Sequence, residues 1–174
     1  TTFYRNKLEF TFSNKKWLSP EEIKSRKKIS NRNALGFHTP GMYDKVINIE
    51  KCWLQPYPSN EIRNFIYNYA LENRLDFFDI RQQKGLLRTL IIKTSTRHET
   101  MVIISFFCDE RQAITKLLEA VKNEFPALTS LMYVINSKGN DTITDLHIEP
   151  YYGKDHIIEE MEGLKFKIGP KSFY

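Results

Sequence analysis

The chain of 174 residues has little of what nucleotide sites, disulfide scaffolds or membrane spans require. Its seven glycines form no G-x-G pattern and no Gly-rich phosphate loop, so no standard nucleotide site is expected. Its two cysteines, Cys52 and Cys108, lie far apart without a spacing motif, which argues against a disulfide framework and predicts a reducing compartment, the cytoplasm. The longest apolar runs are only a few residues, as at 101–104, so no transmembrane helix is expected.

Catalytic and metal-binding patterns are also scarce. The four histidines have no partner at helical spacing, which argues against a zinc site, and no Ser/His/Asp or Cys/His arrangement can be assembled. Cys108 ends an apolar run and is expected to be buried. Cys52 ends an extended segment before a Pro-rich loop, where a metal ligand could lie, but its spacing alone favours a core residue. We therefore expect no catalysis by this chain alone.

The positive charge is concentrated at the start of the chain. Residues 1–33 contain nine Lys or Arg and three acidic residues, whereas residues 34–174 contain 17 basic and 18 acidic residues. All of the net charge of +5 therefore arises in the first fifth of the sequence. This asymmetry indicates an anionic partner, with nucleic acid ranked before an acidic membrane surface. A solvated basic loop is the remaining interpretation.

Basic and aromatic residues are interleaved at 4–7 and at 15–17. RNA-binding surfaces need this mixture, because cations neutralise phosphates and aromatic rings stack on unpaired bases. Lysine stems lying over an apolar sheet face would give the same pattern. We predict that the RNA-binding residues are Arg5, Lys7, Lys15, Lys16, Trp17, Arg26, Lys27 and Lys28.

Hydrophobic periodicity predicts both strands and helices. Alternating apolar residues predict strands at 4–12 and 164–168, and short apolar pieces predict strands at 35–38, 46–49 and 131–135. The β-branched runs 86–94 and 100–107 predict a central antiparallel hairpin. An apolar stripe predicts a helix from about Asn60, and a second stripe predicts a helix that ends at Pro126. Two capping boxes are expected, one with Ser19 as the N-cap and one with Asp109. The segment 25–33 reads as a loop.

This order of elements predicts an α+β fold. Two helices should pack on one face of a mainly antiparallel sheet, and a C-terminal strand or hairpin should lead towards a further domain. The chain ends on Phe173 and Tyr174, and it starts without a lead-in, so we expect it to be the middle of a larger protein.

Three ordered stretches together resemble the central domain of the RNA uracil-5-methyltransferases, in particular the branch that methylates a uridine of 23S ribosomal RNA. The resemblance covers essentially the whole chain, and its residues are those at 4–10, at 35–37 with 48–52, and at 164–174. It implies an enzyme with an N-terminal RNA-binding barrel, this central domain as residues 1–160, and a C-terminal S-adenosylmethionine domain that begins at residues 161–174. The catalytic residues would lie outside this chain, whose role would be to dock the RNA.

The same resemblance implies roles for two residues. Cys52 falls at the position of the fourth ligand of a [4Fe–4S] cluster whose other three cysteines would precede Thr1, so we expect no cluster and a free thiol here. Phe173 matches an aromatic residue near the flipped target base, which needs a stacking partner when it leaves the RNA stack. A monomer is expected. A tRNA substrate, a stand-alone RNA-binding module and a protein-interaction domain are the alternatives.

Overall fold

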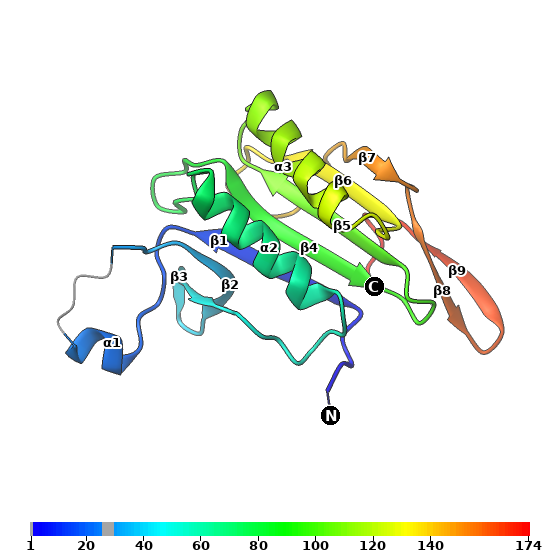
Figure 1. Cartoon of the computed structure of the whole chain (residues 1–174), viewed down its shortest axis with the longest axis horizontal. Coiled ribbons are helices and arrows are strands. Elements are labelled where there is room, and N and C mark those ends of the chain that lie inside the picture. Colours follow the sequence, from blue (N-terminus) through cyan, green and yellow to red (C-terminus); the bar gives the residue numbers. More distant parts are fainter. Residues whose placement is uncertain (1, 26–29) are drawn as a thin grey trace.

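A computed structural model describes residues 2–25 and 30–174. Within these residues a seven-stranded sheet has the order β3-β2-β1-β4-β5-β6-β7 (Figure 1). Its strands are β1 (Lys7–Ser13), β2 (Ala34–Thr39), β3 (Met42–Asn48), β4 (Leu87–Thr94), β5 (Thr100–Phe106), β6 (Ser130–Ile135) and β7 (Glu149–Gly153). A separate hairpin consists of β8 (Ile157–Met161) and β9 (Leu164–Ile168).

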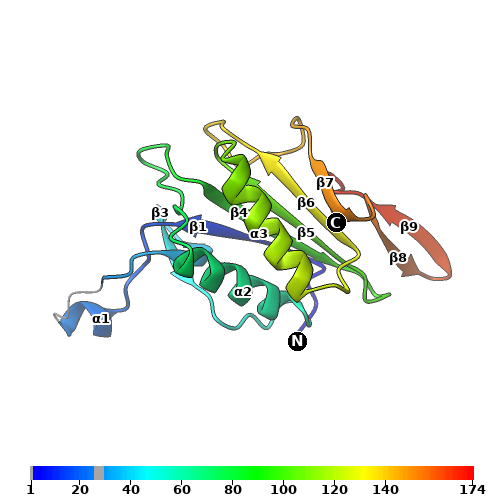
Figure 2. The ribbon, with the colours of Figure 1, turned by 45° about the horizontal axis from the view of Figure 1, so that its top comes forward.

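The predicted α+β class is confirmed. The helices α2 (Ser59–Glu72) and α3 (Arg111–Glu124) lie side by side on one face of the sheet, and the short helix α1 (Pro20–Lys24) lies away from it (Figure 2). Neighbouring strands of the sheet are antiparallel except β5 and β6, which run parallel because α3 carries the chain back between them. No helix in the described residues is long and apolar enough to span a membrane.

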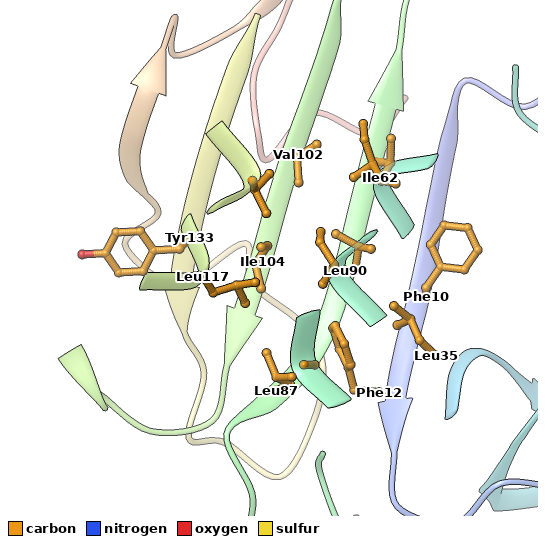
Figure 3. Packing of buried hydrophobic residues seen from close by; sticks show 14 of the residues in the cluster. Phe10, Phe12, Leu35, Ile62, Leu87, Leu90, Val102, Ile104, Leu117 and Tyr133 are labelled. Atoms are coloured by element: carbon orange, nitrogen blue, oxygen red, sulfur yellow. The ribbon is translucent and has the colours of Figure 1, made fainter. Parts of the chain in front are cut away.

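The main core lies between the helices and the sheet. Alternate residues of β1, β4 and β5 point towards the helices, among them Phe10, Leu90 and Ile104, which are all fully buried (Figure 3). Ile62 of α2 and Leu117 of α3 pack onto them from above. Because successive residues of a strand point to opposite faces of the sheet, the remaining residues of these strands point to the face without helices.

The far face holds a smaller apolar cluster. Strand residues such as Ile91 and Ile103 pack there against Ile143 and against Ile157 and Ile168 of the β8–β9 hairpin. The position at which the sequence places a domain boundary, residue 160, lies within β8. The C-terminal residues also lie on this face and end beside β4 (Figure 1).

One of the two predicted capping boxes is wrong. Ser19 and Glu22 form the expected reciprocal bonds at the start of α1. The N-cap of α3 is instead Glu110, whose side chain makes no capping bond. The carboxylate of Asp109 accepts from the guanidinium of Arg111 at 2.9 Å, and this ion pair takes the place of the backbone cap.

Candidate nucleic-acid interface

The described cations that we predicted to bind RNA lie at the two ends of β1. Arg5 and Lys7 lie at its start, and Lys15 and Lys16 follow its last residue. At about 3.3 Å per residue, the eight steps from Lys7 to Lys15 correspond to roughly 26 Å. The cations therefore form two separate candidate regions for contact with RNA, one at each end of β1. The predicted residues Arg26, Lys27 and Lys28 lie outside the described residues.

Acidic neighbours partly neutralise the three lysines. The Lys7 ammonium lies 3.3 Å from the Glu9 carboxylate, and the Lys16 ammonium lies 2.9 Å from that of Glu22. Lys15 lies 3.4 Å from the buried carboxylate of Asp79. The pKa of Glu22 is lowered by hydrogen bonds from the Ser19 backbone and the Lys16 side chain, so the Glu22 carboxylate stays ionised at neutral pH. The surface is therefore less positive than a count of its cations suggests.

The aromatic residues beside these cations differ in exposure. Trp17 is half-buried. Its backbone N–H donates to the Val46 carbonyl at 2.8 Å, and this bond attaches the segment after β1 to β3. At the other end, Arg5 lies 5.4 Å from the centroid of the exposed Tyr4 ring. A ring beside a guanidinium is a surface on which a base can stack.

Phe173 is fully exposed next to the start of β1. The Lys7 ammonium lies 5.1 Å from the centroid of its ring. A cavity of about 140 Å³ lies beside it, with Lys7, Ile91 and Thr144 among its lining residues.

Lys93 holds the segment that carries Phe173. Its side chain is 1% exposed, and its ammonium donates to the carbonyl oxygens of Gly169, Pro170 and Ser172 at 2.9–3.0 Å. The Tyr174 hydroxyl donates to the Thr94 carbonyl at 3.3 Å and also contacts Glu159. Residues on both sides of Phe173 are thus bound to the sheet, while its ring points into solvent.

Cys52 is positioned by a side chain of α2. Its backbone N–H donates to the Asn60 side chain at 2.7 Å, and the Asn60 amide donates back to the Cys52 carbonyl at 3.0 Å. Cys52 is 6% exposed and packs in the main core, next to the exposed Trp53. A [4Fe–4S] cluster is held by four thiolates, and no group of three or more metal-binding side chains occurs in the described part of the chain. These residues by themselves therefore do not fit a cluster.

The prediction from sequence missed four cations that shape the two regions. Lys93 was hidden inside an apolar strand run. The other three, Arg32, Lys45 and Arg81, line a polar cavity together with Lys15, although all of these cavity residues are distant from one another in sequence. No local pattern could bring them together, because their proximity depends on the pairing of β1, β2 and β3.

The chain is similar over its full length to proteins named as RNA methyltransferases. It is 53% identical to an uncharacterized RNA methyltransferase of Bacteroides thetaiotaomicron and 54% identical to one of Porphyromonas gingivalis. A third, from Chlorobaculum tepidum, is 31% identical over 98% of the chain. The predicted resemblance to RNA methyltransferases is confirmed. The chain spans 39%, 38% and 36% of these three proteins, so it corresponds to one segment of them.

The fold has a solved counterpart. A crystal structure of the Pyrococcus abyssi tRNA (uracil-54, C5)-methyltransferase, in complex with S-adenosyl-L-homocysteine, matches with a TM-score of 0.69. The match covers 98% of this chain and 36% of that protein. At 18% identity it shows a shared fold. No family model matches the chain.

Proposed function

We propose that this chain is the RNA-docking part of an S-adenosylmethionine-dependent enzyme that methylates carbon 5 of a uridine in 23S ribosomal RNA. The observation that carries the proposal is the full-length similarity to RNA methyltransferases at 53–54% identity. The fold shared with a methyltransferase of uracil carbon 5 supports the reaction type. Since the chain spans about two-fifths of its relatives, methyl transfer itself is assigned to the rest of the protein.

In this proposal the chain binds and orients RNA. Arg5, Lys7, Lys15 and Lys16 contact phosphates, and the exposed ring of Phe173 stacks on the uracil after it leaves the RNA stack. Lys93 holds the segment that carries Phe173 against the sheet through hydrogen bonds to three backbone carbonyl oxygens. S-adenosylmethionine supplies the methyl group when it is bound to the rest of the enzyme. The proposed enzyme is a cytoplasmic monomer.

Cys52 enters the proposal as one ligand of an iron–sulfur cluster in the longer protein. Its backbone position, fixed by Asn60, is what a pre-organised ligand needs. Replacing Cys52 by serine in the full-length protein should then lower the iron content and the visible absorbance of the purified enzyme. An unchanged iron content would contradict this role and leave Cys52 as a core residue.

The test is methyl transfer by the purified full-length protein. It is incubated with S-adenosylmethionine labelled in the methyl group and with unmodified 23S ribosomal RNA or unmodified tRNA, in separate reactions. Label recovered as 5-methyluridine in the ribosomal RNA alone supports the proposal. Label only in tRNA would reassign the substrate, and label in neither RNA would favour a non-catalytic RNA-binding module.

A further inference from the structure

A polar cavity lies at the end of β1, about 26 Å from Lys7 by the strand rise. Its volume is about 430 Å³, and its lining residues are Asn14, Lys15, Arg32, Asp44, Lys45 and Arg81. We call it the cationic cavity. It is built by the segment after β1, the residue pair before β2, the edge strand β3, and the turn before β4.

Backbone hydrogen bonds fix this arrangement. Val46 donates to the Lys15 carbonyl at 3.3 Å, and Lys16 donates to the Arg32 carbonyl at 2.7 Å. The Arg32 guanidinium donates back to the Lys16 carbonyl at 3.2 Å. The cations are thus attached to paired backbone, which reduces the entropy lost when a ligand orders them.

Two buried carboxylates orient the cations. Asp79 is 2% exposed and accepts hydrogen bonds from Asn14 at 3.0 Å and from the backbone of Arg81 and Gln82. Its carboxylate also lies 3.4 Å from the Lys15 ammonium as an ion pair. Burial alone would raise the pKa of Asp79, but these donors lower it overall, so the carboxylate is ionised at neutral pH. It therefore anchors both Lys15 and the turn that carries Arg81.

Asp44 acts on the other side of the cavity. It is 5% exposed, accepts from Nε of Arg81 at 2.7 Å, and lies 3.7 Å from the Lys45 ammonium. Burial again opposes ionisation, and Arg81 and Lys45 outweigh it and lower the pKa of Asp44. Arg81 donates to Asp44 through Nε, so the terminal nitrogens of this guanidinium can serve as further donors.

The side chains around the cavity carry a net positive charge that a bound anion can neutralise. Four cations surround two carboxylates, so the cationic cavity with Asp79 carries two excess positive charges. Tyr43, 65% exposed, lies next to it with its ring centroid 5.9 Å from the Arg81 guanidinium. Asn14 also lines the cavity, and its buried Oδ1 has no hydrogen-bond partner among the described residues.

We propose that the cationic cavity binds a backbone phosphate of RNA, with the neighbouring base against Tyr43. This site rests on the proposed function and deepens it, because it names a second RNA contact remote from Phe173. Arg and Lys side chains held by buried acids suit phosphate oxygens, and an exposed ring beside them suits an unpaired base. The contact reads the backbone and not the sequence, so it contributes affinity to all RNAs alike.

The test measures the salt dependence of RNA binding by the full-length protein. A fluorescein-labelled 30-nucleotide RNA hairpin is titrated at several KCl concentrations, with wild type and with the double variant Lys45→Gln, Arg81→Gln. We expect the double variant to bind the RNA more weakly than the wild type at low salt. Its slope of log K, the association constant, against log salt should be shallower by about 1. A second variant adds Asp44→Asn, so that no buried carboxylate is left unpaired, and should show the same loss.

The matched control removes two positive charges elsewhere, with Lys116→Gln on α3 and Lys165→Gln on β9. Both side chains are exposed, and the control should keep the wild-type slope. If the cavity variants kept that slope too, or if the control lost as much, the phosphate site would be refuted. Wild-type protein that bound no RNA would instead contradict the proposed function, so the two failures can be told apart.

Discussion

Among the described residues, three cationic side chains are almost completely buried, and each donates hydrogen bonds to backbone carbonyl groups. Arg63 donates to Leu35, Arg88 donates to Asn136 and Lys138, and Lys93 donates to the C-terminal segment. Burial lowers the pKa of Arg63 to about 10, so it stays charged at neutral pH. At the scale of single residues, part of the positive charge in the sequence therefore binds backbone carbonyl groups inside the fold and does not face a ligand.

The Lys93 contacts predict a local effect. Replacing Lys93 by methionine removes the donor shared by the carbonyls of Gly169, Pro170 and Ser172, so residues 169–174 should detach from the sheet. We expect faster amide hydrogen exchange at Gly169 and Ser172, while the amides of β5 keep their protection. The control is Lys165→Met, an exposed lysine of β9. Equal exchange in both variants would contradict the role of Lys93.

Lys93 also predicts a pH dependence of stability. Burial, assisted by the nearby Lys7, lowers the pKa of Lys93 to about 8. The unfolded chain keeps this proton up to its ordinary pKa of about 10.5, so between these values it binds more protons than the folded chain. Lys93 should therefore raise the free energy of unfolding as the pH rises from about 8, by at most about 3 kcal/mol. Urea unfolding at pH 7 to 10 should show a rise in the wild type that Lys93→Met lacks, and parallel curves would contradict it.

The exposure of Phe173 predicts a functional effect without a structural one. Phe173→Ala in the full-length protein should lower kcat/KM for methyl transfer by about 5- to 100-fold, the range expected for one base-stacking contact. Its stability should stay within about 0.5 kcal/mol, because the ring is fully exposed. Phe173→Tyr should retain most activity. Full activity of the alanine variant would contradict the proposed stacking of Phe173 on the target uracil.

At the scale of elements, the sheet is strongest where two apolar faces meet. Strands β4 and β5 are buried along their whole lengths, with helices on one side and the smaller cluster on the other. The apolar, β-branched stretches at their centres, 90–92 and 101–104, are typical of a central strand pair, which is why the sequence predicts this hairpin correctly.

Leu90 tests this central packing. It is fully buried on β4 beneath the two helices, so Leu90→Ala should lower the free energy of unfolding by about 2–5 kcal/mol in urea denaturation. The exposed Thr115→Ala on α3 serves as the control and should change it by less than about 0.5 kcal/mol. A loss below 1 kcal/mol for Leu90→Ala would be inconsistent with the close packing seen in Figure 3.

Other elements were less predictable for physical reasons. β7 contains Pro150 and shows no clean alternation, so its identity as an edge strand depends on pairing with β6. The turn between β2 and β3 has a local signal, since Gly41 takes the positive φ of 77° that glycine adopts readily. The cap of α3 was mispredicted, because Asp109 pairs with the Arg111 side chain.

At the scale of the whole molecule, the cations predicted from the charge asymmetry form two candidate contact regions at the ends of β1. The sequence singles out Lys7, Lys15 and Phe173 as candidates, because charge counts and the terminal pattern are local. It could not place Arg81 beside Lys45, since their proximity arises only when β3 and the turn before β4 meet at the sheet edge. An RNA that contacts both regions would lie along β1, with its target uridine at the Phe173 end.

The most direct test of this account is the 5-methyluridine content of 23S ribosomal RNA in the source organism. Nucleoside mass spectrometry would compare cells that lack the gene with cells in which it is restored. We predict one 5-methyluridine that disappears with the gene and returns with it. Unchanged 23S ribosomal RNA in both strains would contradict the proposed function.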